Sequence, residues 1–168
     1  MSKCTHTLGG CSPPPIKLSE VVDQFEPDTS LSYGVPTNGA PDLRRAIAEY
    51  YTDVEEPNVL VTSGTAEANF LMAIAIIETN AEIIIQTPSY MQIHGIAEAM
   101  GARIREFHLR EEDGFAPDLE ELKNLISPNT RLIHFTNPNN PTGAKLSSDE
   151  VRAICEIGED AGCYVASD

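Results

Sequence analysis

Residues 135–143 read FTNPNNPTG and follow an apolar segment, Arg131 to Phe135, that is typical of a buried strand. Asn140 lies beside Pro141 and close to Pro138, at the exit from this strand. Proline restricts the backbone conformation, and asparagine offers an amide group for hydrogen bonding. The loop is therefore rigid and presents polar side chains in fixed positions. We therefore expect this loop to hold a small molecule in place.

Strand and helix patterns alternate along the chain around this loop. Expected strands cover residues 58–62, 82–87, 103–109, 131–135 and 163–167, and expected helices start at Pro41 and cover 65–78, 91–100, 118–126 and 147–162. Alternation with short connections predicts an α/β fold of three αβα layers, with a mostly parallel sheet covered by helices on both faces. Ligands of such sheets bind outside the carboxyl ends of the strands, so we expect the functional residues at the strand exits.

The chain divides into an N-terminal arm, residues 1–32, and a sheet domain, residues 33–168. The arm is rich in proline and weakly periodic, and the triplet Pro13-Pro14-Pro15 does not favour a helix. A length of 168 residues with 41% hydrophobic content is enough for one core. No apolar run reaches the roughly 20 residues of a membrane span, and no secretory signal is visible. We expect a cytoplasmic protein that does not bind membranes.

Charge and cysteine content exclude several classes of function. The formal net charge is -15, and the 11 lysines and arginines are scattered, so nucleic acid is not an expected partner. Four cysteines are too few and too irregularly placed for a disulfide framework, so reduced thiols are expected. Cys4, His6 and Cys11 lack a further ligand pair, and no metal site is predicted.

Three other strand exits carry residues of chemical interest. Ser63-Gly64-Thr65-Ala66 is a turn of small residues that leads into a helix, where free N–H groups favour a phosphate, although many ordinary turns look alike. Tyr90 follows Pro88-Ser89 and is placed to stack on a flat ring or to be a half-buried core residue. Asp168 is placed to pair with a protonated ring nitrogen or to cap a helix. His94, His108 and His134 have no matching nucleophile nearby and are interpreted as structural or surface residues.

In this order and spacing, the four exits resemble the large domain of the aminotransferase class I and II family, the fold type I enzymes that depend on pyridoxal phosphate. The resemblance runs from about Ser32 to Asp168. It includes Tyr33, Gly39, the helix sequence LRRAIA at 43–48 and the turn sequence VTSGTAEA at 61–68.

The resemblance implies that the cofactor is pyridoxal 5'-phosphate and that each exit contacts a different part of it. Gly64, Thr65 and Ala66 would hold the phosphate, Tyr90 would stack on the ring, Asn140 would bind the phenolic oxygen and Asp168 would keep the ring nitrogen protonated. Tyr33 would reach the phosphate of a neighbouring subunit, which implies a homodimer. The implied function is transfer of an amino group between an amino acid and a 2-oxo acid.

The family's catalytic lysine, which forms a Schiff base with the cofactor, is expected beyond Asp168. None of Lys3, Lys17, Lys123 or Lys145 has the right context, so no catalytic residue is assigned in this chain. We interpret the chain as part of a longer aminotransferase that would be inactive alone. Alternatives are another pyridoxal-phosphate reaction on the same fold, a lyase or a decarboxylase, or a non-catalytic binding module. The substrate amino acid is not predicted.

Overall fold

A computed structural model of the chain describes residues 15–22, 28, 34 and 36–168. The chain forms two units, Met1–Pro36 and Thr37–Asp168. In the described part of the first unit, a short helix, α1 (Leu18–Val21), was not expected from the sequence. The assignment of residues 1–32 as an arm stays a prediction.

The second unit alternates helices with four strands. Its elements are α2 (Pro41–Ala48), the 3-10 helix η1 (Glu56–Asn58), α3 (Thr65–Ile76), β1 (Glu82–Thr87), α4 (Gln92–Ala99), β2 (Arg103–His108), the 3-10 helix η2 (Glu111–Asp113), α5 (Leu119–Leu125), β3 (Thr130–Phe135), α6 (Ser148–Ala161) and β4 (Tyr164–Ser167). The sheet has the order β2-β1-β3-β4 and every pairing in it is parallel. The predicted α/β fold is confirmed, and no described helix is both long and apolar enough to cross a membrane.

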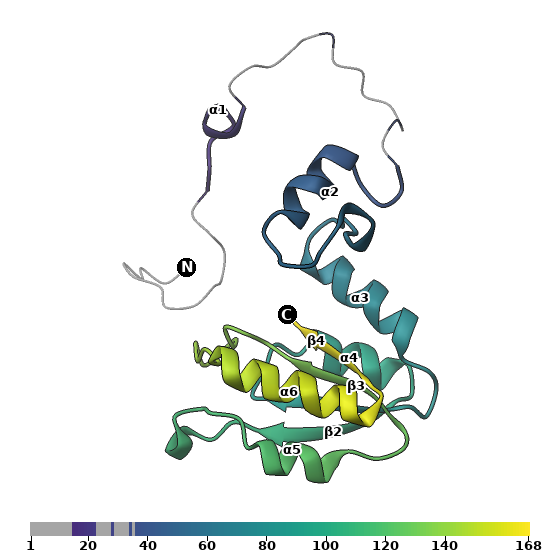
Figure 1. Cartoon of the computed structure of the whole chain (residues 1–168), viewed down its shortest axis with the longest axis vertical. Coiled ribbons are helices and arrows are strands. Elements are labelled where there is room, and N and C mark those ends of the chain that lie inside the picture. Colours follow the sequence, from purple (N-terminus) through teal and green to yellow (C-terminus); the bar gives the residue numbers. More distant parts are fainter. Residues whose placement is uncertain (1–14, 23–27, 29–33, 35) are drawn as a thin grey trace, which may run out of the picture. The chain divides into compact units, whose positions relative to one another are not determined.

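Helices cover both faces of the sheet, with α6 in front of it and α4 behind it in Figure 1. Successive side chains of a strand point to opposite faces. Ile83 and Ile85 of β1 accordingly join a core with residues of α3 and α4, whereas Ile84 joins a core with residues of α5 and α6. The three consecutive isoleucines therefore pack against the helices on both faces of the sheet.

The strand order reverses direction between β1 and β3. From β1 the chain moves outward to β2, and from β3 it moves outward to β4 on the other side. At such a point the loops leaving the two central strands diverge, and the crevice between them is where ligands bind in open α/β sheets. The loops that follow Thr87 and Phe135 flank this position.

Short-range hydrogen bonds explain where several helices begin and end. The Asp118 carboxylate accepts from the N–H groups of Glu120 and Glu121 at the start of α5. Ser147 and Glu150 cap each other reciprocally at the start of α6. Gly162 ends α6 with a φ of 66°, a conformation that glycine adopts without strain.

The strand expected at residues 58–62 is wrong. In the structure, residues 59–62 join η1 to the turn before α3 and belong to no strand of the sheet. The Val61 N–H donates to the Asn38 carbonyl at 3.1 Å, and the Arg44 Nε–H donates to the Val59 carbonyl at 2.9 Å. The segment has the apolar composition of a strand, but groups of residues 38 and 44 bind it, and in the part of the chain that the structure describes no strand pairs with it.

Candidate functional site

The turn before α3 presents free backbone N–H groups at a helix N-terminus. Gly64 has a φ of 91°, and a Cβ added to it would meet no atom within 4 Å, so the space above the turn is open. Within the described residues, the N–H groups of Thr65 and Ala66 donate no hydrogen bond. Because the helix dipole also favours negative charge here, the turn can hold an anion such as a phosphate.

Neighbouring side chains fix the shape of this turn. The Thr62 hydroxyl donates to the Gly64 carbonyl at 3.0 Å, and the Glu67 carboxylate accepts from the Ser63 N–H. Both contacts leave Thr65 and Ala66 unengaged. The turn is therefore held in place before any ligand is bound.

The exits of β1 and β3 are joined by the buried side chain of Asn139. Its amide nitrogen donates to the Pro88 carbonyl at 3.0 Å and to the Thr142 hydroxyl at 2.8 Å, and its oxygen accepts from Gln86 at 2.9 Å. A buried amide held by three hydrogen bonds makes both loops rigid. Sequence reasoning pointed to Asn140 and missed the structural role of Asn139, because adjacent asparagines in one loop carry no signal of which is buried.

Tyr90 and Asn140 lie on these rigid loops with their side chains accessible. Tyr90 is 49% exposed, and Asn140 is half-buried. An exposed aromatic ring at a strand exit can stack on a flat ligand, and a free amide can donate to an oxygen. The peptide bonds before Pro88, Pro138 and Pro141 are cis.

Asp168 is anchored to the exit of β3 by its own backbone. Its N–H donates to the Phe135 carbonyl at 3.0 Å, and its carbonyl accepts from the Asn137 N–H at 2.9 Å. One carboxylate oxygen, Oδ2, accepts from the Asn69 amide at 3.0 Å. Within the described residues no hydrogen bond engages the other oxygen, so Oδ1 can accept a proton-bearing ligand nitrogen.

Two amide side chains connect Asp168 to the turn before α3. Asn69 of α3 donates to Oε1 of Gln92, at the start of α4, over 3.2 Å, and the Gln92 amide donates to the Ala66 carbonyl at 2.8 Å. Sequence reasoning missed both residues. The one available signal was a polar Asn69 inside the otherwise apolar stretch that follows Glu67.

His134 is buried in β3. It pairs with Ala166 of β4, and Ala166 precedes Asp168 by two residues. Burial lowers the pKa of His134 below 6.5, and the charge of Asp168 acts in the opposite direction and raises it. The imidazole is therefore neutral near pH 7. His134 lies within a strand, as expected from the sequence, and its interpretation as a structural residue stays a prediction.

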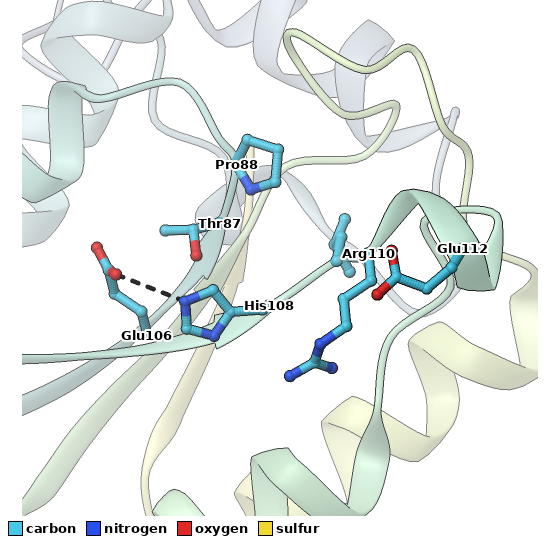
Figure 2. Close-up of a pocket in the computed structure, with 7 residues that line it drawn as sticks. Thr87, Pro88, Glu106, His108, Arg110 and Glu112 are labelled. Atoms are coloured by element: carbon cyan, nitrogen blue, oxygen red, sulfur yellow. Dashed lines mark ion pairs between the residues drawn. The ribbon is translucent and has the colours of Figure 1, made fainter.

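A separate pocket lies on the other side of the β1 exit and contains none of the predicted site residues. Figure 2 shows Thr87 and Pro88 on one side of it and His108, Arg110 and Glu112 on the other. Beside the pocket, burial tends to raise the pKa of Glu121, but hydrogen bonds from His108 and Arg110 outweigh it and lower that pKa. The basic groups at this pocket are thus paired with carboxylates.

The structure places most of the predicted residues at one edge of the sheet. Gly64, Thr65 and Ala66 form one turn, the amide pair links that turn to Asp168, and Asn139 links the loops that carry Tyr90 and Asn140. Tyr33 lies outside the described residues. The turn before α3 and the Tyr90 ring fit the phosphate and the ring of pyridoxal phosphate. The Asn140 amide, which makes no hydrogen bond within the described residues, fits its phenolic oxygen, and the anchored Asp168 carboxylate fits its ring nitrogen. These individual roles stay predictions.

Comparison with known proteins identifies the family to which the chain belongs. Residues 13–168 match the family model "Aminotransferase class I and II". An aspartate aminotransferase of Pyrococcus horikoshii is 40% identical over 149 residues, which cover 84% of this chain and 37% of that protein. A capreomycidine synthase of Streptomyces vinaceus is 38% identical over 109 residues, 65% of this chain and 28% of that protein.

Solved structures show the same fold. The crystal structure of a PLP-dependent aminotransferase from Streptococcus suis has a TM-score of 0.80 and 36% identity, and the match covers 83% of this chain and 37% of that one. The chain thus spans little more than a third of the length of these aminotransferases. Because the family model matches most of the chain, this protein belongs to the aminotransferase class I and II family.

Proposed function

We propose that this chain supplies the cofactor-binding part of a pyridoxal-phosphate-dependent aminotransferase, which transfers an amino group between an amino acid and a 2-oxo acid. One observation carries the proposal: the Asp168 carboxylate is anchored by hydrogen bonds that lead back to the turn where Thr65 and Ala66 offer free N–H groups. A site that binds an anion at one end and a protonated nitrogen at the other suits this cofactor.

Each residue has a distinct task in the proposal. Thr65 and Ala66 bind the phosphate through their N–H groups, and Gly64 allows its close approach. Tyr90 covers one face of the ring, Asn140 donates to the phenolic oxygen, and Asp168 holds a proton on the ring nitrogen. When bound, pyridoxal phosphate supplies an electron sink that stabilises the carbanion formed at the substrate's α-carbon.

The remaining parts of the proposal concern the whole protein. We place the catalytic lysine in sequence that follows Asp168, and we assign no such role to Lys123, which pairs with Glu120 at 2.7 Å on α5. The proposed active form is a cytoplasmic homodimer in which Tyr33 contacts the phosphate bound by the partner. The substrates are an amino acid and a 2-oxo acid, in keeping with the aspartate aminotransferase among the relatives.

A second candidate is a different pyridoxal-phosphate reaction on the same site. It is favoured by the similarity to capreomycidine synthase, which is 38% identical over 109 residues. The residues assigned to the cofactor serve either reaction, because they contact the cofactor and leave the choice of substrate to other groups.

The proposal is tested with the full-length protein encoded by the gene and its Asp168→Ala variant. We expect the wild type to bind pyridoxal phosphate, seen by absorbance after desalting, and to transfer amino groups from an amino acid panel to a 2-oxo acid. Asp168→Ala should lower the transfer rate at least about a hundredfold, because the negative charge that holds a proton on the ring nitrogen is lost.

Asp160→Ala is the matched control, since Asp160 is an exposed carboxylate on α6. It should retain both binding and transfer. A wild-type protein that binds no pyridoxal phosphate, or an Asp168→Ala variant that transfers at the wild-type rate, would refute the proposal. Cofactor binding with elimination or decarboxylation in place of transfer would favour the second candidate.

A further inference from the structure

Asn69 is a buried polar residue in a helix that is otherwise mostly apolar. It lies in α3 and is 7% exposed. Burying an amide is unfavourable unless its hydrogen-bonding groups find partners. The Asn69 amide nitrogen meets this requirement with two acceptors, Oδ2 of Asp168 and Oε1 of Gln92.

Gln92 extends this contact to the anion-binding turn. Its oxygen accepts from Asn69 at 3.2 Å, and its nitrogen donates to the Ala66 carbonyl at 2.8 Å. A series of hydrogen bonds therefore leads from the first turn of α3, through Gln92 at the start of α4 and Asn69, to the carboxylate at the end of β4. Three elements that are distant in sequence meet through two side chains.

We propose that Asn69 and Gln92 are positioning residues that hold the Asp168 carboxylate at a fixed place relative to the phosphate-binding turn. The inference rests on the proposed function, since it concerns the same cofactor. The two hydrogen-bonded amides fix the distance between the turn and the Asp168 carboxylate. A ligand that binds to the turn then meets a carboxylate that is already positioned, so binding at one end of the site strengthens binding at the other.

The chemistry of an amide suits this role better than that of a charged side chain. The Asn69 N–H group is a neutral donor that orients an ionised carboxylate and occupies only its Oδ2 atom. A lysine or arginine at this position would neutralise the carboxylate and compete with the ring nitrogen for it. The neighbouring His134 does not compete in this way, because burial lowers its pKa and keeps it neutral.

The test is a double-mutant cycle on the affinity of the full-length protein for pyridoxal phosphate, measured by equilibrium dialysis. Asn69→Ala should weaken binding about tenfold in the wild-type background, the value of one hydrogen bond to a charged group. In an Asp168→Ala background the same change should have almost no effect, because no carboxylate remains for Asn69 to position.

Two further variants keep the experiment decisive. Gln92→Ala removes the hydrogen bond that Gln92 accepts from Asn69 and the one that it donates to the Ala66 carbonyl. It should weaken cofactor binding less than Asn69→Ala does, and again only when Asp168 is present. This variant tests the inference even if Asn69→Ala folds poorly. Asn124→Ala removes an exposed asparagine of α5 and should change affinity in neither background.

The outcomes separate the two proposals. If Asn69→Ala and Gln92→Ala weaken binding equally with and without Asp168, or not at all, Asn69 has a purely structural role and the positioning inference is overturned while the proposed function stands. If the wild-type full-length protein binds no pyridoxal phosphate, the proposed function falls and the inference falls with it.

Discussion

His134 is a buried residue from which we expect a pH dependence of the stability of the domain. It is 1% exposed, and within the described residues neither ring nitrogen has a hydrogen-bond partner. Burial lowers its pKa from 6.5, with a smaller opposing effect from Asp168. A proton is therefore taken up more readily by the unfolded chain than by the folded one as the pH falls.

We predict that the free energy of unfolding decreases as the pH falls below 6.5 toward the lower pKa of folded His134. The decrease should reach about 1.4 kcal/mol per pH unit at most, the value for one proton. His134→Leu should remove this contribution, and urea unfolding at several pH values measures it. Ile133→Val, an equally buried change on the opposite face of β3, should keep the wild-type slope. An unchanged slope in His134→Leu would contradict the prediction.

Residue chemistry at the site was partly predictable from sequence. The position of Asp168 at the end of β4 was predictable, because the strand before it is recognisable by its own composition. Gly64 was expected after a strand, but it follows a segment that is not one, and its place at the start of α3 was predicted correctly. That either residue contacts the cofactor stays a prediction. Asn69 and Gln92 did not follow, because their partners lie 99 and 26 residues away. Which polar side chains meet is decided by how α3 packs beside α4, and the local sequence carries little of that information.

At the scale of elements, local patterns succeeded where an element is recognisable by itself. The strand expected at 82–87 has the same bounds as β1, because three isoleucines lie between polar turn residues. The prediction of a strand at 58–62 was wrong because a strand requires a neighbouring strand with which it can pair. Here the Val61 N–H donates to the Asn38 carbonyl, which belongs to no strand. Apolar composition indicates burial but does not establish strand pairing.

The contact between α6 and β4 depends on a glycine. A Cβ added to Gly158 would lie 2.2 Å from Cγ2 of Val165, so any side chain here would push the helix from the strand. We predict that Gly158→Ala lowers the free energy of unfolding by about 1–3 kcal/mol, as overpacking does. Urea unfolding followed by circular dichroism measures the change.

Gly95→Ala is the matched control for this packing argument. Gly95 also lies inside a helix, α4, but an added Cβ would meet no atom within 4 Å. Alanine should therefore stabilise the domain, by up to about 1 kcal/mol, because it is the better helix former. If Gly158→Ala stabilises the domain as Gly95→Ala does, helix propensity and not the Val165 contact governs position 158.

At the scale of the whole molecule, negative charge dominates. The chain has 26 acidic and 11 basic residues. Several arginines of the described part already pair with carboxylates, including Arg44 with Glu56 at 3.3 Å and Arg110 with Glu121 at 2.7 Å. The surplus carboxylates have no cations to balance them and repel one another in the folded state more than in the expanded chain.

We predict that sodium chloride raises the thermal unfolding midpoint of the 168-residue chain. Added salt shortens the screening length to about 10 Å at 0.1 M, which weakens the long-range repulsion more than the close ion pairs. Each kcal/mol gained should raise the midpoint by about 2–4 °C at this chain size. Scanning calorimetry at increasing sodium chloride measures the shift, with equal osmolality of sucrose as the comparison for non-ionic effects. A midpoint that falls with sodium chloride would mean that the ion pairs outweigh the repulsion and that the net charge does not limit stability.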